Sequence, residues 1–321
     1  MKVIGIGNAL TDLMTQIEND EILSLLKLPK GSMQLVDAIT SKMASDATTQ
    51  FKRTLASGGS AANTIHGLAK LGMQVGFIGK VGEDEMGDFF NNDMVKSGIK
   101  TNLIRSKTPS GLALALVSPD GERTFATYLG AAVELKKEDI DANMFVGYDL
   151  LHIEGYLLQN YDLILHSMKS AKEKGLKVSL DLASYNVVEE HRDFLNKIIE
   201  SYTDIIFANE EESKALTHLD SADSARYLSK IVEIAVVKTG PGGSIVGINQ
   251  EVTKVPTKEI TPVDTTGAGD LYASGFLHAL SKGKSPYECG RIGSIIASEV
   301  ISHIGAKIPD EKWETLIKLA K

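Results

Sequence analysis

The sequence has few of the features that mark secreted, membrane-bound or nucleic-acid-binding chains. Its 321 residues contain one cysteine, Cys289, which cannot form a disulfide within the chain and therefore favours a reducing compartment. The net charge is −8, so the chain lacks the basic surface that non-specific nucleic-acid binding requires. No apolar run approaches the ~20 residues that span a bilayer. We predict a soluble cytoplasmic protein with no membrane or nucleic-acid partner, and we expect Cys289 in its core.

The hydropathy pattern of the second half predicts an α/β fold. The short apolar runs that we interpret as strands are 149–153, 176–181, 203–207 and 233–238. Amphipathic helices lie between them, and this alternation is typical of a parallel sheet covered by helices on both faces. Ligands of such sheets bind beyond the carboxyl ends of the strands. Glu154, Asp181 and Asn209 fall at or just past three of these ends.

Residues 264–270, Asp-Thr-Thr-Gly-Ala-Gly-Asp, form the most specific motif in the chain. They precede an expected helix at 271–280, whose first backbone N–H groups and dipole favour a bound anion. Glycines at 267 and 269 let several N–H groups approach one phosphate. Asp270 lies at the edge of this site, where it could accept a proton from an attacking alcohol. The alternative is an N-capping turn without chemistry, but seven specific residues at a helix start favour the anion site.

Two other glycine-containing segments suggest ligand contacts. Gly58 and Gly59 let a ligand touch the backbone, and Asn63, early in the following helix, offers both a donor and an acceptor. The alternative here is a tight turn followed by a polar helix residue. A Gly-x-Gly at 5–7 suggests dinucleotide binding, but Leu10 stands where the third glycine of that fingerprint belongs. A dinucleotide-dependent oxidoreductase is therefore disfavoured.

Residues 111–128 predict a β-hairpin with its turn at 119–122. Leucines alternate with small residues in its first strand, so the hairpin has one apolar face. A hairpin of this kind inside an α/β chain suggests a small sheet placed over a pocket.

Two segments further along the chain have both a structural and a functional interpretation. Asn209 is followed by three glutamates, which an N-capped acidic first helical turn would explain. Lys238 begins a glycine-rich connection at 240–243 that could cradle a nucleotide or simply turn the chain. This connection is not a P-loop, because the chain has no G-x-x-x-x-G-K-[S/T] sequence.

Together these motifs resemble those of the ribokinase-like (PfkB-type) carbohydrate and nucleoside kinases. Residues 264–270 resemble the family's second signature, and residues 58–63 resemble its first. Asn209 with Glu212 resembles the family's N-x-x-E motif. The resemblance covers nearly the whole chain and keeps the family's order.

The resemblance implies one ribokinase-like kinase domain, 1–321, with a doubly wound, mainly parallel sheet and helices on both faces. A small β-sheet lid would be inserted in it, built from segments near 31–57 and 102–129. An isolated sheet this small is marginally stable unless something packs on it. We therefore expect either a homodimer formed lid to lid or a mobile lid that becomes ordered over its substrate.

By the same resemblance the chain binds ATP, Mg²⁺ and a small sugar or nucleoside. Asp12 lies where the family holds substrate hydroxyls, although a loop aspartate that caps a turn is the alternative. Asp264 and Thr266 stand where many members hold a monovalent cation such as K⁺. The implied assignments are Asp270, Gly267, Ala268 and Gly269 for catalysis; Asn8, Asp12, Gly58, Gly59, Asn63 and Glu154 for substrate; Asn209, Lys238, Gly240 and Gly243 for nucleotide; and Glu212 for Mg²⁺ through water.

The predicted reaction is ATP-dependent phosphoryl transfer to a primary hydroxyl of a sugar or ribonucleoside, with Asp270 as the base. Residues 8–12 and the long stretch before the first signature resemble the adenosine-kinase-like branch, so adenosine kinase proper is one alternative. A nucleoside needs a flat apolar slot, for which Phe51, Phe125 and Tyr128 are the candidates in the lid. A non-catalytic sugar- or nucleoside-binding protein on the same fold is another alternative, and the presence of Asp270 argues against it.

Overall fold

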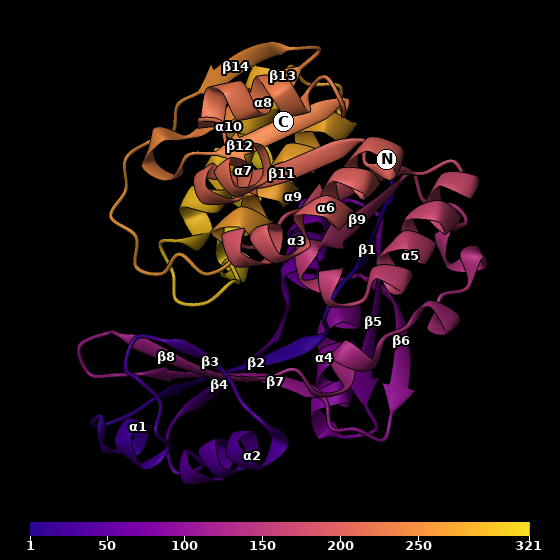
Figure 1. Ribbon diagram of the computed structural model, residues 1–321. Coiled ribbons are helices and arrows are strands. Elements are labelled where there is room, and N and C mark those ends of the chain that lie inside the picture. The colour runs from indigo at the N-terminus through magenta and orange to yellow at the C-terminus, as the bar shows by residue number, and fades with distance from the viewer. Residues whose placement is uncertain (321) are drawn as a thin grey trace.

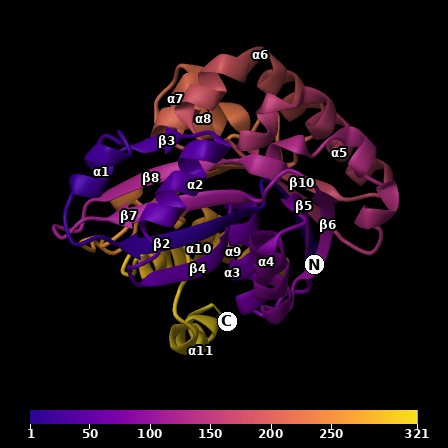
Figure 2. The ribbon, with the colours of Figure 1, turned by 90° about the horizontal axis from the view of Figure 1, so that it is seen from below.

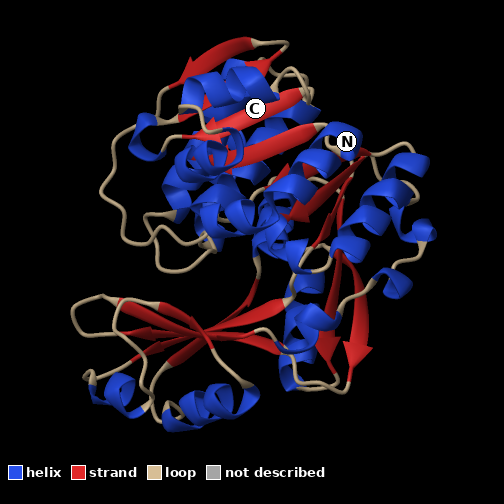
Figure 3. Cartoon of the chain, in the orientation of Figure 1, coloured by secondary structure: helices blue, strands red, loops and turns tan. Residues whose placement is uncertain are grey.

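Two β-sheets organise residues 1–320, the part of the chain that the computed structural model describes. In Figure 1 the larger sheet and its helices form the upper and right-hand body, and the smaller sheet projects from it at the lower left. Figure 3 shows in the same view that helices surround the larger sheet, whereas the helices of the smaller sheet lie below it, on the side away from the larger one.

The larger sheet has nine strands in the order β14-β13-β12-β11-β10-β9-β1-β5-β6. They are β1 (Val3–Ile6), β5 (Val75–Gly82), β6 (Lys100–Ser106), β9 (Leu150–Glu154), β10 (Lys177–Asp181), β11 (Ile205–Asn209), β12 (Ile234–Lys238), β13 (Ser244–Ile248) and β14 (Glu251–Val255). The pairs from β6 to β12 are parallel, and β13 and β14 add an antiparallel edge. The chain order reverses between β1 and β9, which is the position where doubly wound sheets bind ligands.

Helices cover both faces of this sheet because successive strand residues point to opposite sides. Phe207 packs into one apolar cluster with Phe276, while its neighbour Ile206 packs into a second cluster with Ile198. The helices are α1 (Glu21–Leu25), α2 (Ala38–Ala47), α3 (Ser60–Lys70), α4 (Glu85–Lys96), α5 (Tyr161–Glu173), α6 (Tyr185–Tyr202), α7 (Glu210–Thr217), α8 (Ser221–Leu228), α9 (Ala268–Ser281), α10 (Pro286–Val300) and α11 (Asp310–Leu319). Short 3₁₀ helices lie at Gly130–Glu134, Lys137–Asp139, Ala142–Phe145, Gly155–Gln159 and Gly240–Gly242. The predicted doubly wound α/β fold is confirmed.

The smaller sheet, which we call the lid, has five strands in the order β3-β8-β7-β2-β4. They are β2 (Leu10–Gln16), β3 (Met33–Leu35), β4 (Arg53–Gly58), β7 (Gly111–Val117) and β8 (Arg123–Tyr128). Leu13, Leu114 and Leu116 point to the outer face and pack against Leu23 of α1 and Ala44 of α2. The view from below in Figure 2 shows α1 and α2 lying across these strands. The outer face of the lid is therefore covered by the same chain.

The lid differs from the prediction in two places. Residues 102–105 were expected in it, but they lie in β6, which pairs in parallel with β5 of the larger sheet. Leu103 and Ile104 pack against the two opposite cores of that sheet, which accounts for the placement. Conversely, no lid segment was predicted before residue 31, yet β2 pairs with β4 and β7 inside the lid.

Two expectations from composition can be compared with residues 1–320. Cys289 is buried in α10 and packs in the core, as predicted. Among the helices in this part of the chain, none combines the length and apolar character needed to span a bilayer.

Candidate active site

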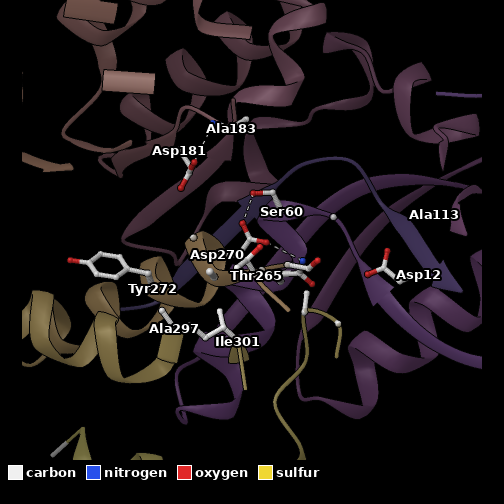
Figure 4. Close-up of a pocket in the computed structure, with 18 of the residues that line it drawn as sticks. Asp12, Ser60, Ala113, Asp181, Ala183, Thr265, Asp270, Tyr272, Ala297 and Ile301 are labelled. Carbon is white, nitrogen blue, oxygen red and sulfur yellow. Dashed lines mark hydrogen bonds between the residues drawn. The ribbon is translucent and has the colours of Figure 1, made fainter. Parts of the chain in front are cut away.

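A cavity of about 1000 Å³ is lined by the lid on one side and by the carboxyl ends of β9, β10, β11 and β12 on the other. Its size is within the range of pockets that hold small molecules. In the close-up of Figure 4, Asp270 at the start of α9 lies between Asp12 of the lid and Asp181 at the end of β10. The cavity therefore brings together carboxylates from three distant parts of the chain.

Asp270 is held by α3 in the first turn of α9. Ser60 Oγ donates to its Oδ1 at 2.7 Å, and Asn63 Nδ2 donates to its Oδ2 at 3.0 Å. The hydroxyl of Thr64 donates to its backbone oxygen at 3.1 Å. Burial raises the pKa of Asp270 to about 6; the hydrogen bond from Asn63 opposes this shift, and the charge of Asp181 adds to it. The result is a fixed carboxylate whose pKa suits a general base near neutral pH.

The start of α9 presents backbone N–H groups to the same cavity. The helix begins at Ala268, three residues earlier than predicted, and its N-cap, Gly267, has a left-handed φ of 75° and no capping side chain. A Cβ on Gly267 would lie 2.6 Å from the Cβ of Ala306. Within residues 1–320, the N–H groups of Gly267 and Gly269 have no hydrogen-bond acceptor, whereas Ala268 donates to Thr265 O at 3.2 Å. Uncapped N–H groups at the positive end of a helix favour an anion.

Asp12 lies on β2, where glycines make room for its side chain. A Cβ on Gly58 would lie 2.3 Å from Asp12 Oδ1, and one on Gly59 would lie 2.1 Å from Asn8 O. Gly59 also has a positive φ of 99°, a conformation that favours glycine. Burial raises the pKa of Asp12 to about 6, and the positive charge of Lys307 opposes the shift. Asp12 thus offers a carboxylate to a ligand inside the cavity.

Glu154, predicted to bind substrate, accepts hydrogen bonds from other residues of the protein. Its Oε1 accepts from both the backbone N and the Nδ2 of Asn8 at 2.8 Å, and its Oε2 accepts from Ala61 N at 2.8 Å. The residue is 1% exposed, and burial raises its pKa to about 7 against the opposing effect of these hydrogen bonds. Glu154 therefore joins the segment after β1 to the start of α3. It positions Asn8, which lines the cavity.

At the other end of the cavity, Asn209 caps α7. Asn209 Oδ1 accepts from Glu212 N, and the two oxygens of Glu212 accept from the backbone N and the Nδ2 of Asn209, all at 2.8 Å. The capping interpretation of this motif is therefore correct as far as local structure goes. Lys238 Nζ donates to Asp181 Oδ2 at 2.9 Å. Burial raises the pKa of Glu212 to about 7, and the charge of Lys238 opposes that shift.

Residues 1–320 contain no cluster of three or more His, Cys, Asp or Glu side chains arranged to hold a metal ion. Both oxygens of Glu212 are already bonded to Asn209. Mg²⁺ usually keeps several waters and binds through substrate phosphates in kinase sites. A Mg²⁺ ion at this site would therefore have to be held mainly by the phosphates of a ligand, and Glu212 could reach it only through water.

The predicted monovalent-cation residues have a different partner in this structure. Asp264 Oδ1 accepts from Thr266 N at 2.7 Å, and its Oδ2 accepts from Gly305 N at 2.6 Å. The guanidinium of Arg123 also donates to Asp264 Oδ2 and forms a salt bridge with it. Asp264 is thus already neutralised by a side chain of the lid. The residues as folded do not fit a cation, which would have to displace Arg123.

All of the predicted site residues except Gly58 and Asp264 line this same cavity. Among the lining side chains that sequence reasoning missed, Ser60, Arg123 and Lys307 carry polar or charged groups next to the predicted residues. Ser60 lies three positions before Asn63 in the first signature, so helical spacing could have pointed to it. Arg123 lies in the predicted hairpin and Lys307 lies in the loop after α10, and no sequence pattern marked either residue as a ligand contact.

The fold and the cavity together define a class of enzyme. A doubly wound sheet, a β lid and a carboxylate beside an anion-binding helix start are the parts that a kinase of a small alcohol needs, because phosphoryl transfer depends mainly on positioning and electrostatics. The sequence profile of the pfkB family carbohydrate kinases matches residues 31–313, and the chain belongs to that family. It is a phosphotransferase that acts on an alcohol group of a sugar or nucleoside, with ATP as a substrate.

Its relatives include both kinds of kinase. The structure of an adenosine kinase from Sinorhizobium meliloti superposes with a TM-score of 0.87 and 32% identity, covering 100% of this chain and 99% of that one. An uncharacterized sugar kinase from Archaeoglobus fulgidus is 32% identical over 243 residues, 75% of this chain and 96% of its own. A 5-dehydro-2-deoxygluconokinase from Halalkalibacterium halodurans is 28% identical over 305 residues, 89% of this chain and 91% of its own.

Proposed function

We propose that the protein phosphorylates the 5′-hydroxyl of a ribonucleoside, using ATP with Mg²⁺ bound to its phosphates. The observation that carries this proposal is the apolar inner face of the lid. Met33 and Leu35 line the cavity yet are 59% and 62% exposed, and Leu10 and Phe125 line it beside them. A nucleobase has an apolar plane that would cover such side chains, whereas a free sugar is polar on most sides.

The opposite side of the same space suits a ribose. Asn63 donates from Nδ2 to Asp270, while its Oδ1 is buried and receives no hydrogen bond from residues 1–320. Buried polar atoms are normally hydrogen-bonded, so a ligand hydroxyl at Asn63 would satisfy this oxygen. Asp12 would accept from further ribose hydroxyls. The primary hydroxyl would then lie next to Asp270.

In the proposed reaction the acceptor oxygen attacks the γ-phosphorus of ATP, and its proton passes to a carboxylate oxygen of Asp270. The bond from the γ-phosphorus to the bridging oxygen breaks, and ADP leaves. The N–H groups of Gly267 and Gly269 stabilise the charge of the transferring group, and Lys238 adds a positive charge at the nucleotide end. Mg²⁺, when bound, neutralises phosphate charge. We assign Asn209, Gly240 and Gly243 to the wall that contacts the nucleotide.

The lid does not need a second copy of the chain to cover its outer face, because α1 and α2 already do so. We therefore propose that closure over substrate takes place within one chain. Lid-to-lid dimerisation, the other expected arrangement, is not needed to cover the outer face of the lid.

A second candidate is a sugar kinase, which the similarity to the H. halodurans 5-dehydro-2-deoxygluconokinase favours. A panel of purine and pyrimidine nucleosides, pentoses, hexoses and 5-dehydro-2-deoxygluconate, with ADP release as the readout, separates the two candidates. We expect turnover with a nucleoside, and ³¹P NMR of the product should show a 5′-monophosphate. Turnover with sugars alone would overturn the nucleoside assignment. ADP release that no acceptor increases would overturn the kinase proposal as a whole.

A further inference from the structure

Lys307 is a charged side chain of the cavity that the proposed reaction does not use. It lies in the loop between α10 and α11, two residues after Gly305, and it lines the cavity. Its Nζ is buried and has no hydrogen-bond partner within residues 1–320. A buried ammonium group is costly unless other charges compensate it, so its surroundings determine what it does.

The charged and titratable groups that face Lys307 come from four elements: Asp12 on β2, Asp93 on α4, Asp270 on α9, and Lys70 and His66 on α3. The two positive or potentially positive groups on α3 oppose its charge. The three carboxylates favour it, and Asp12 is the strongest of them.

Two of the carboxylates have other partners. Asp93 accepts from Ser57 N at 2.9 Å, and Asp270 accepts from both Ser60 and Asn63. Asp12 receives no hydrogen bond from residues 1–320, so Lys307 supplies its compensating charge. A carboxylate and an ammonium, neither of which has a hydrogen-bond partner within residues 1–320, therefore line the same cavity and influence each other's charge.

We propose that Lys307 is a positioning residue for the acceptor, whose positive charge keeps Asp12 ionised at neutral pH so that Asp12 can accept hydrogen bonds from acceptor hydroxyls. This inference rests on the proposed function, because it assumes that Asp12 binds the acceptor. A protonated Asp12 would lose an acceptor site and present a donor to hydroxyls that must themselves donate. Lys307 acts through Asp12 and need not touch the acceptor.

The charge states support this assignment. Burial raises the pKa of Asp12 to about 6, and Lys307 is the largest influence that opposes the rise. Burial lowers the pKa of Lys307 to about 8, with Asp12 the largest opposing influence. Each charge therefore favours the other: the ammonium lowers the pKa of Asp12, and the carboxylate raises the pKa of Lys307. Removing the ammonium should move the titration of Asp12 upward into the neutral range.

A direct test needs no acceptor. The side-chain carboxyl ¹³C shift of Asp12, assigned with Asp12→Asn, is followed against pH by NMR in protein labelled at aspartate. We expect Lys307→Met to raise the Asp12 midpoint by at least about one pH unit, which is a tenfold change in its ionisation constant. Lys307→Arg should keep the wild-type midpoint. Lys70→Met is the matched control, because it removes a nearby positive charge that pairs with Asp310 at 2.6 Å. An unchanged midpoint in Lys307→Met would overturn the proposal.

The second arm measures the dissociation constant of adenosine, or of whichever acceptor supports turnover, by calorimetry between pH 6.5 and pH 9. Lys307→Met should weaken binding about tenfold at pH 6.5 and approach wild type at pH 9, where Asp12 ionises without help. A structural role would weaken binding equally at every pH. In an Asp12→Asn background, Lys307→Met should not weaken acceptor binding any further.

The two proposals fail in different ways. If wild-type protein binds acceptor and the Lys307→Met protein follows its pH dependence, the inference is wrong while the proposed function stands. If wild-type protein binds no nucleoside or sugar, the proposed function is wrong, and the NMR titration still decides whether Lys307 sets the charge of Asp12. Should Lys307→Met fold poorly, as circular dichroism would show, Lys307→Gln serves in both arms.

Discussion

Arg123 on β8 of the lid forms a salt bridge with Asp264, 141 positions later, in the loop that leads into α9. The Asp264 side chain is fully buried and also accepts from the backbone of Thr266 and Gly305. One ion pair therefore connects the lid to the loop that precedes the proposed anion site. The position of the lid and the charge of the anion-site loop should change together.

Replacing Arg123 should loosen this connection and expose Asp264 to solution cations. In Arg123→Gln we expect faster hydrogen exchange in β7 and β8. We also expect its melting temperature to be higher in KCl than in tetramethylammonium chloride, whereas the melting temperature of the wild type should be the same in both salts. Lys30→Gln is a matched control, because Lys30 forms salt bridges with Asp20 and Asp120 that do not reach the larger sheet. If K⁺ stabilises the wild type and Arg123→Gln equally, Arg123 does not take the place of a cation.

Asp270→Asn keeps the size of the side chain and removes the proton acceptor. We expect kcat to fall by roughly 10²–10⁴, the usual contribution of a positioned general base. ATP affinity should change little, because the N–H groups at the start of α9 are untouched. The melting temperature at pH 7 should rise, because ionising a carboxylate whose folded pKa is raised to about 6 opposes folding. Steady-state kinetics and calorimetry of ATP binding check this, and near-normal turnover would rule out Asp270 as the base.

The pH profile follows from two carboxylates with similar pKa values. Asp270 and Asp12 both have pKa values of about 6 in the folded chain and are needed ionised, so activity should fall as pH drops through 6. The acidic limb of log kcat/KM should approach a slope of two, since both groups titrate in the free enzyme, whereas that of log kcat should be shallower once acceptor holds Asp12. Stability should change in the opposite sense and decrease as pH rises from about 4 to 6. An acidic limb with a slope of one in both profiles would show that Asp12 does not need to be ionised for activity.

The parts of the site that could be predicted from the sequence are those whose residues are contiguous in a short motif. Residues 264–270 and 58–63 each place a helix start and a polar side chain within one short segment, so local rules of helix geometry suffice to interpret them. The alternating second half gave the parallel sheet for the same reason. The structure then added what these motifs could not state, namely that Asn63 and Ser60 hold Asp270 directly.

What could not be predicted depends on contacts between segments far apart in the sequence. Arg123 reaches Asp264 only because the lid hairpin packs next to the loop before α9. Lys307 stands out because its Nζ is buried without a hydrogen-bond partner within residues 1–320, and burial is a property of the fold rather than of a residue type. Likewise β6 and β2 have similar short apolar patterns, and it is the packing of Leu103 and Ile104 on two cores that assigns β6 to the larger sheet.

The acidic segment at the start of α7 allows a sharp comparison between neighbours. Glu212 is buried and bonded to Asn209, whereas Glu211 is exposed in the same turn. We expect Glu212→Gln to raise the Mg²⁺ concentration needed for half-maximal activity and to leave acceptor affinity unchanged, while Glu211→Gln changes neither. Titration of Mg²⁺ at fixed ATP measures this. If both variants give the wild-type curve, Glu212 serves only to cap the helix.

The lid should close over the acceptor within one chain. Its outer face packs on α1 and α2, so closure needs no partner, while its inner face exposes Met33 and Leu35 to the cavity. Covering those side chains with a nucleobase removes apolar surface from water and should stabilise the closed position. A closed lid would also exclude water from the phosphoryl group and limit hydrolysis of ATP.

Hydrogen exchange measures this closure directly. Amides in β7 and β8 should gain protection when an acceptor that supports turnover is added, while those in β10 and β12, which are central to the larger sheet, should change little. Light scattering should give a mass near 34.6 kDa with and without acceptor. A mass twice that value, abolished by a charged substitution at Met33, would place a second copy on the inner face instead. Unchanged exchange in β7 and β8 with every productive acceptor would show that the lid is already closed before substrate binds.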